Sequence, residues 1–186
     1  MSKLVFIGKN LDHDALKRSF EACLATPENM RLALEKRRVT ELGSRFMSST
    51  QKNDVAKLEE LIKAGVPVGF ANGVKQTALH VAALWGNIEA ATVLISHGAP
   101  LNVQNSLSGA TPLHMVAGSS KDYAGRLKCA ELIIAAGADL TVQDFGGRTA
   151  WQAAVDAPAE QKELEALLRP AGKVPELEKG AAGMSL

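Results

Sequence analysis

The feature that most constrains this fold is a short stretch of small and apolar residues that recurs along the chain. It begins at Thr77 as TALHVAALWG, returns at Thr111 as TPLHMVAG, and appears a third time at Thr149 as TAWQAAV. The two intervals, from 77 to 111 and from 111 to 149, are 34 and 38 residues long. Such self-similarity is typical of repeat arrays, in which each unit buries its apolar face against its neighbours. Repeat arrays are mostly binding scaffolds, so this pattern favours a binding role.

The residues around each stretch predict a pair of helices. The first helix ends at Gly86, and the second runs from Ile88 to Ser96 and closes at Gly98. Glycine follows helix C-termini because it adopts the left-handed conformation without a steric cost. The third unit closes in the same way at Gly137. We therefore expect helix-turn-helix units separated by loops.

These features resemble the ankyrin repeat family. A Thr-x-Leu-His opening close to the family's T-P-L-H-x-A signature and Gly-Ala pairs at 98–99 and 137–138 carry the resemblance, which covers about residues 44–172. It implies a mostly α-helical solenoid of about four helix-turn-helix repeats, with about eight helices in antiparallel pairs. It also implies β-hairpin tips near Asn72, Ser106 and Phe145.

The two terminal repeats depart from this pattern. In the first, residues 46–65, only the second helix at 54–65 matches the family well. The fourth has Trp151 and Gln152 in place of Leu and His, a break at 157–160 and a weak last helix over 163–169. We expect it to form a C-terminal cap, because the outer face of a terminal repeat meets water or another segment. Residues 173–186 mix proline, glycine and charge without a period, and are expected to form a disordered tail.

Each loop between repeats is expected to end in a hairpin tip. The first tip contains Asn72 followed by Gly73, a pair favoured where both turn residues need a positive φ. The other tips centre on 105–109 and 144–147. The third repeat also carries an insertion at 118–125, between a helix ending near Ala117 and one beginning near Arg126. Insertions in such arrays map to surface loops and are often functional.

The N-terminal segment has a different character. Residues 3–8 predict a short buried strand, and a helix with an apolar stripe is expected from Asp12 to about Thr26. On the sequences LVFIGKNLD at 4–12 and FEACL at 20–24, residues 3–26 resemble the last strand and helix of the C-terminal domain of CobW-type GTPase metallochaperones. The resemblance implies that segment 1–26 is the tail of a larger CobW-like chain fused to the repeats, or a relic of one.

The chemistry of the CobW family is absent from this sequence. No G-x-x-x-x-G-K-[ST] phosphate loop and no Cys-x-Cys-Cys metal motif occurs, so neither a nucleotide nor a metal role is expected. The strand at Leu4 to Ile7 would leave backbone N–H and C=O groups unpaired if it stood alone. We therefore expect it to pair with a second copy of the chain, a CobW-like domain or a partner protein.

A further helix is expected from Pro27 to about Leu42, because proline followed by glutamate favours a helix start. We assign residues 27–43 to this capping or linker helix. Its charge run at 35–38 is either a solvated face or a basic docking patch.

Composition excludes several function classes. The formal net charge is +1, so no overall field attracts nucleic acid or a membrane surface. The two cysteines, Cys23 and Cys129, form neither a disulfide framework nor a zinc-binding spacing, which favours an intracellular, most simply cytoplasmic, protein. The longest N-terminal apolar run, Leu4 to Ile7, is too short for a signal peptide or a membrane span, so no membrane insertion is expected.

No set of residues indicates catalysis. His80 and His114 occupy equivalent positions, and we expect each imidazole to bond the preceding threonine and the neighbouring loop. A metal site would need further ligands, and none recur nearby. Without an acid–base pair, a nucleophile set or a cofactor loop, we expect no enzyme activity, no cofactor and no reactive thiol.

The expected function is that of a protein-interaction scaffold, which binds a folded partner through the concave surface that the ankyrin resemblance implies. Trp85 is either a hot-spot anchor in this groove or a residue packed under the insertion of the next repeat. The alternative function is a regulatory or targeting part of a CobW-like GTP-dependent metallochaperone whose GTPase domain is absent from this chain. The candidate partner-binding residues are Val74, Gln76, Leu84, Trp85, Leu107, Ser108, Tyr123, Phe145 and Arg148.

Overall fold

The computed structural model describes residues 14, 17, 26–155 and 162–169. The chain divides into two compact units, Met1–Leu42 and Gly43–Leu186. Four predicted features lie outside the described residues: the strand at 4–7, most of the helix from Asp12, the break at 157–160 and the tail at 173–186.

The described residues form eight helices. They are α2 (Pro27–Gln51), α3 (Val55–Lys63), α4 (Ala78–Trp85), α5 (Ile88–Ser96), α6 (Pro112–Gly118), α7 (Tyr123–Ala135), α8 (Ala150–Val155) and α9 (Lys162–Leu168). The same residues contain isolated β-bridges, Ala71 with Thr77 and Gln143 with Thr149, in place of extended strands. The described part of the chain is therefore mostly helical, as predicted.

Helix α2 is longer than expected. The sequence predicts one helix to about Leu42 and a separate one near Phe46, but α2 continues without a break to Gln51. Gly43 lies inside the helix because the Phe70 ring occupies the place of a side chain there. A Cβ atom on Gly43 would lie 2.1 Å from the nearest ring atom of Phe70. Gly43 therefore makes room for the Phe70 ring, and it does not mark the end of a helix.

In the unit Met1–Leu42, the described part of α2 is exposed along almost its whole length. Its large exposed apolar residues are Met30, Leu32, Leu34 and Val39. The charge run at 35–38 is exposed as well, as both interpretations of it require.

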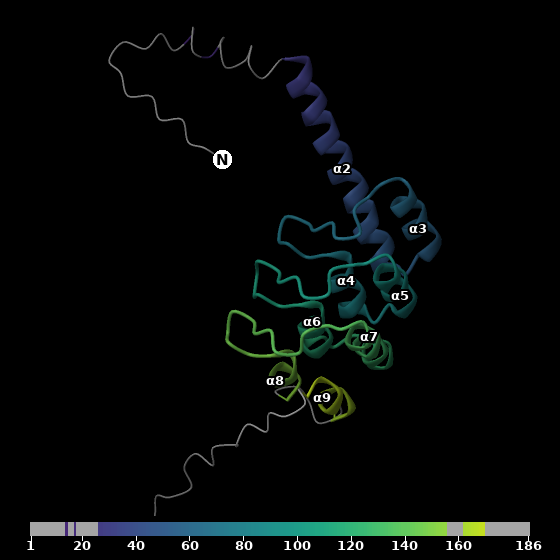
Figure 1. Ribbon diagram of the computed structural model, residues 1–186, viewed down its shortest axis with the longest axis vertical. Helices are drawn as coiled ribbons and strands as arrows, with labels where there is room; N and C mark the ends of the chain where they lie inside the picture. The colour runs from purple at the N-terminus through teal and green to yellow at the C-terminus, as the bar shows by residue number, and fades with distance from the viewer. Residues whose placement is uncertain (1–13, 15–16, 18–25, 156–161, 170–186) are drawn as a thin grey trace, which may run out of the picture. The chain divides into compact units, whose positions relative to one another are not determined.

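In the unit Gly43–Leu186, helices α4 and α5, α6 and α7, and α8 and α9 pack as pairs. The pairs stack so that α4, α6 and α8 form one row and α3, α5, α7 and α9 form the other (Figure 1). The long loops between pairs lie side by side at the edge of the first row (Figure 1). This stack is the predicted repeat array.

Small residues let the helix rows approach closely. Ala82, Ala83, Ala90 and Ala91 are fully buried between the larger core residues. The glycine after α4, Gly86, adopts φ 72° as the sequence predicts. Its backbone also contacts the start of the next pair, since a Cβ there would lie 2.9 Å from backbone atoms of α7. Larger side chains at these positions would separate the repeats.

The insertion of the third repeat is shorter than predicted. Helix α7 begins at Tyr123 instead of near Arg126, so only residues 119–122 separate it from α6. Asp122 stands at the N-cap position, and its carbonyl accepts the Arg126 N–H at 3.0 Å. Gly125, which suggested a loop, is helical because the backbone of Gly86 leaves no room for a side chain there.

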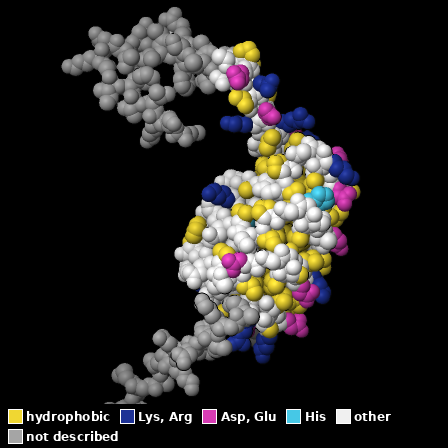
Figure 2. Space-filling model, in the orientation of Figure 1, with side chains coloured by type: hydrophobic (Ala, Val, Ile, Leu, Met, Phe, Trp, Pro, Cys, Tyr) yellow, Lys and Arg dark blue, Asp and Glu magenta, His cyan; other side chains and the backbone are white. Residues whose placement is uncertain are grey.

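Charged side chains gather along the side of the array that carries α3, α5 and α7 (Figure 2). They include short-range pairs of Lys57 with Glu60 and of Lys128 with Glu131. Exposed pairs of this kind contribute little to stability. This side therefore has the mixed charge of a solvated face.

Candidate functional site

One amide or carboxylate oxygen closes each of the loops that join neighbouring pairs, which we call the first (71–77), second (104–111) and third (143–149) tips. In the first tip, Asn72 Oδ1 accepts the N–H groups of Val74 and Gln76, both at 3.0 Å. Asn105 and Asp144 do the same in the second and third tips. These side-chain bonds add to a backbone hydrogen bond across each tip, such as that from the Asn72 N–H to the Gln76 carbonyl at 2.9 Å, in fixing the loop shape.

The predicted turn at Asn72 and Gly73 is wrong in its geometry. Neither residue has a positive φ; the left-handed residue of this tip is Lys75, with φ 56°. The equivalent residues in the other tips are Gly109 and Gly147, with φ 72° and 74°. The Asn72 side chain closes the turn itself, so the left-handed position moves to the residue that returns the chain to α4.

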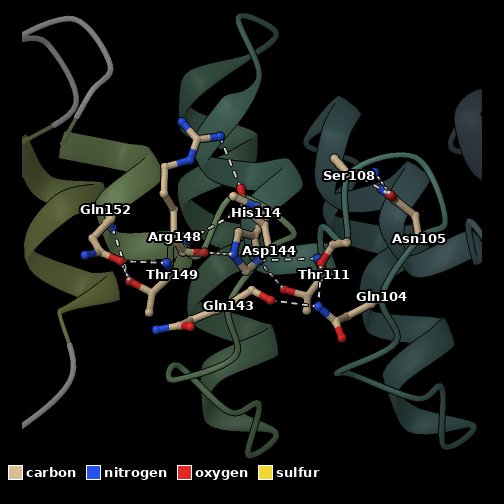
Figure 3. A network of polar contacts seen from close by, with 12 residues as sticks. Gln104, Asn105, Ser108, Thr111, His114, Gln143, Asp144, Arg148, Thr149 and Gln152 are labelled. Carbon is tan, nitrogen blue, oxygen red and sulfur yellow. Dashed lines mark hydrogen bonds and ion pairs between the residues drawn. The ribbon is translucent and has the colours of Figure 1, made fainter.

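Backbone hydrogen bonds join each tip to the next. The Ser106 N–H donates to the Val74 carbonyl at 2.9 Å, and the Phe145 N–H donates to the Ser108 carbonyl at 2.8 Å. The amide nitrogen of Gln104 adds a bond to the Gln143 carbonyl at 2.7 Å (Figure 3). The three tips therefore form one continuous edge.

The histidines of α4 and α6 connect the repeats from inside, as predicted. His114 Nδ1 lies 2.8 Å from Thr111 Oγ1, and its Nε2 lies 2.9 Å from the Arg148 carbonyl of the next tip (Figure 3). His80 repeats the arrangement with Thr77 and with the Ala110 carbonyl at 3.0 Å.

The hydrogen bonds fix the protonation state of His80. Its Nδ1 accepts the Thr77 N–H, so this nitrogen carries a lone pair, and Nε2–H donates to the Ala110 carbonyl. Burial lowers the pKa of the His80 imidazole below its usual 6.5. A neutral imidazole with hydrogen bonds at both ring nitrogens links the two repeats, and it offers no free nitrogen to a metal.

The second and third tips carry the most exposed large apolar side chains of the array. Leu107 is 68% exposed and Phe145 is 69% exposed. The Phe145 ring lies over Gly109, where an added Cβ would come within 2.5 Å of it. Large apolar side chains on a rigid, exposed edge are typical of interaction surfaces.

Trp85, the last residue of α4, is half-buried and lies beside the insertion. The ammonium group of Lys121 stands over its ring, 4.6 Å from the ring centroid. Ser119 fixes the insertion at the same helix end, since its hydroxyl donates to the Leu84 carbonyl at 2.8 Å.

A buried arginine holds the insertion from its other side. Arg126 is only 2% exposed, and its guanidinium donates to the carbonyls of Val116 and Lys121. Burial lowers the pKa of this guanidinium. Its carbon atom Cζ also lies 5.7 Å from the centre of the Tyr123 ring, whose hydroxyl accepts the Leu164 N–H at 3.4 Å. The insertion is thus tied to the pairs before and after it.

The predicted binding residues fall into two groups. One group lies on the tips: Val74, Gln76, Leu107, Ser108, Phe145 and Arg148. The other lies at the C-terminal end of α4 and around the insertion: Leu84, Trp85 and Tyr123. Helix α4 separates the two groups by about 12 Å, its length at 1.5 Å per residue.

Sequence reasoning missed the side-chain roles that shape both groups, although it named Asn72 and Arg126. An Asn or Asp stands five or six residues before each repeated threonine, at 72, 105 and 144, and this spacing could have identified the tip-closing side chains. Arg126 carried no such signal, because a charged residue on a helix is ordinarily expected at the surface.

The described residues contain no group of three or more His, Cys, Asp or Glu side chains that could hold a metal ion. Cys129 is buried, and burial raises the pKa of its thiol to about 12. Such a thiol stays protonated and is a poor nucleophile. None of the helices in the described part of the chain has the length and hydropathy to cross a membrane.

Two family models match this chain. The model described as "Ankyrin repeats (3 copies)" matches residues 46–144, and the model of the cobalamin synthesis protein cobW C-terminal domain matches residues 1–24. Both matches agree with the resemblances given above.

Several curated proteins are similar over the repeats. The inactive serine/threonine-protein kinase TEX14 of Mus musculus is 31% identical over 112 residues, which are 59% of this chain and 7% of that protein. The NF-kappa-B inhibitor cactus of Drosophila melanogaster is 29% identical over 137 residues, 70% of this chain and 26% of that protein. The chain thus spans about a quarter or less of the length of these relatives. Because the ankyrin model covers more than half of the chain, and its residues include the stacked pairs α4 with α5 and α6 with α7, the chain belongs to the ankyrin repeat family.

Proposed function

We propose that this chain is a protein-interaction scaffold whose tips and first-row helices α4 and α6 form a concave surface for a folded partner. The observation that carries the proposal is the pair of apolar side chains, Leu107 and Phe145, on neighbouring tips. Each is more than two-thirds exposed, although the backbone beneath both is held by hydrogen bonds. A rigid surface binds with little loss of conformational entropy.

The relatives support an interaction role in general terms. One of them is named as an inhibitor of NF-kappa-B and another as an ankyrin repeat and SOCS box protein. Neither name identifies the partner of this chain. What they share with it is the repeat array, and the array is the part that we propose for binding.

Within this proposal the tips supply most of the affinity. Val74 and Gln76 of the first tip are half-buried, whereas Leu107, Phe145 and Arg148 present more surface to a partner. A hot spot consists of a few side chains that become fully desolvated, while the near-neutral residues around them exclude water.

The test is affinity capture with the full chain as bait, comparing the wild type with the double variant Leu107→Ser, Phe145→Ser. Both side chains are exposed, so the fold should survive. We expect the tip variant to bind at least one captured protein with an affinity lower by roughly 30-fold or more. This is the effect of removing a hot spot worth about 2 kcal/mol. The matched control is Leu34→Ser, Val39→Ser, which removes two exposed apolar side chains of α2.

Equal capture by wild type and tip variant would contradict binding through the tips. The variant Trp85→Ala separates the two interpretations of that residue. As an anchor, it should reduce capture without changing the unfolding temperature. As a packing residue under the insertion, it should lower the unfolding temperature and leave capture unchanged.

A second proposal rests on the cobW match at residues 1–24. In it, the chain is the regulatory or targeting C-terminal part of a CobW-like GTP-dependent metallochaperone whose GTPase domain is absent from this chain. The chain itself should neither bind nor hydrolyse GTP, since the sequence has no phosphate loop. Isothermal titration and a phosphate-release assay check this, and GTP turnover that persists through repurification would contradict it.

A further inference from the structure

The first tip contains the only asparagine of the sequence that precedes a glycine, Asn72 before Gly73. Because glycine has no Cβ, its backbone nitrogen is less hindered than that of any other residue with an N–H group. A bond from this nitrogen to the side-chain carbon Cγ of the asparagine closes a five-membered ring. The pair is therefore a candidate for a reaction between the backbone and the Asn72 side chain.

The Asn72 side chain is held over the backbone that follows it. Its Oδ1 accepts the N–H groups of Val74 and Gln76, both at 3.0 Å, so the side chain reaches past Gly73 to the next peptide groups. Two backbone N–H groups on one carbonyl oxygen stabilise the negative charge that develops there when a nucleophile attacks its carbon. The closure of this tip thus also activates Cγ of Asn72 for attack.

The attacking and leaving nitrogens are both free to react. Within the described part of the chain, neither the Gly73 N–H nor Nδ2 of Asn72 donates a hydrogen bond. Gly73 is exposed and Asn72 is half-buried, so water and hydroxide reach the pair. An added Cβ at Gly73 would meet no atom of the described structure within 4 Å, which shows that the space beside the attacking nitrogen is open.

Asn105 of the second tip has the same acceptor geometry but lacks the other features. Its Oδ1 accepts the N–H groups of Leu107 and Ser108 at 3.1 and 2.9 Å. The nitrogen that would attack, that of Ser106, is held by its hydrogen bond to the Val74 carbonyl at 2.9 Å. Asn105 is also only 2% exposed. The fold therefore protects this asparagine and leaves the one in the first tip open.

We propose that Asn72 is a site of spontaneous deamidation. The Gly73 nitrogen gives its proton to hydroxide and forms a bond to Asn72 Cγ. The bond from Cγ to Nδ2 breaks, and Nδ2 takes up a proton from water and leaves as ammonia. Water then opens the resulting succinimide ring. Opening at Cγ yields aspartate, and opening at the backbone carbonyl carbon yields isoaspartate, in which the peptide bond runs through the side chain.

The two products affect the first tip differently. Aspartate keeps the acceptor oxygen, as in the third tip, where Asp144 Oδ1 accepts the N–H groups of Gly146 and Arg148 at 2.9 Å. Isoaspartate adds a carbon atom to the backbone, which disturbs the hydrogen bond of 2.9 Å from the Asn72 N–H to the Gln76 carbonyl. Both products add a negative charge to the edge that we propose for binding, but the reaction does not depend on that proposal.

Peptide mass spectrometry tests the proposal after incubation of the full chain near pH 8. The digest resolves asparagine, aspartate and isoaspartate at both positions, so Asn105 is the internal control. We expect Asn72 to be converted at least about fivefold faster than Asn105, the rate factor for breaking one ordinary hydrogen bond before attack. The variant Gly73→Ala should slow the conversion of Asn72 and keep the fold, because the added methyl group has space and Gly73 has no positive φ.

A synthetic peptide of residues 67–80 shows what the fold contributes. We expect Asn72 to react in the folded chain at least as fast as in this peptide. Slower conversion in the folded chain than in the peptide would overturn the proposal, and so would equal rates at Asn72 and Asn105 in the folded chain. A Gly73→Ala chain that deamidates at the wild-type rate, with helical dichroism unchanged, would overturn it as well.

Discussion

The histidine links between repeats make a quantitative prediction about stability. Replacing His80 with Ala removes the bonds to Thr77 and to the Ala110 carbonyl and leaves both backbone groups buried. Each lost bond costs about 1 kcal/mol, and the two abandoned groups and the vacated ring volume bring the total to about 3–4 kcal/mol. Domains are typically stable by only about 5–15 kcal/mol, so this is a large loss.

Two further variants show whether the links are the cause. His80→Gln should cost only about 1–2 kcal/mol, because glutamine can accept the N–H of the preceding threonine, as Gln152 accepts the Thr149 N–H. His97→Ala, at an exposed histidine of the same array, should change stability by less than about 0.5 kcal/mol. Urea unfolding followed by circular dichroism at 222 nm measures all three. The reasoning is refuted if His80→Ala costs less than about 1 kcal/mol, or if His80→Gln costs as much as His80→Ala.

Three other predictions concern a histidine, a cysteine and the N-terminal segment. Burial holds the His80 pKa below 6.5, so the unfolded chain binds a proton that the folded chain does not. The contribution of His80 to stability should therefore be full above pH 6.5 and fall as the pH drops below it. Thermal melts measure this dependence, and His80→Gln should weaken it. In a Cys23→Ser background, Cys129 should react with a thiol reagent at pH 8 only after unfolding, and rapid reaction of the folded chain would contradict its raised pKa of about 12. Deleting residues 1–26 should leave the array folded while abolishing any association made by the predicted strand; loss of the helical dichroism would instead identify this segment as a structural cap.

The sequence by itself determined the helix pairs and the links between them. The spacing of Thr77, Thr111 and Thr149 revealed the period, because the same short motif recurs. Glycines at 86, 98 and 137 marked helix ends, because that signal is local to a few residues. The roles of His80 and His114 were predictable for the same reason, since half of each link lies within one helical turn.

The candidate site was only partly predictable. The exposure of Leu107 and Phe145 follows from their places in loops. The relation of Trp85 to the insertion does not, because it depends on how Lys121 and Ser119 reach back across the preceding repeat. Sequence reasoning assigned the nine candidate residues to the tips and first helices, and how far the tip group lies from the group around Trp85 depends on the length of α4.

Contacts within the folded chain decided the features that contradict the residues' local conformational preferences. Gly43 continues a helix instead of ending one, because the Phe70 ring fills the space beside it. Gly125 is helical because the backbone of Gly86 lies against it, and Lys75 takes the left-handed conformation that glycine normally takes, because the Asn72 side chain closes the turn. Arg126 is buried because two backbone carbonyls at the insertion accept its guanidinium protons. In each case the deciding atoms come from elsewhere in the fold or from a side chain acting on the backbone, so the residue's own propensity does not reveal the outcome.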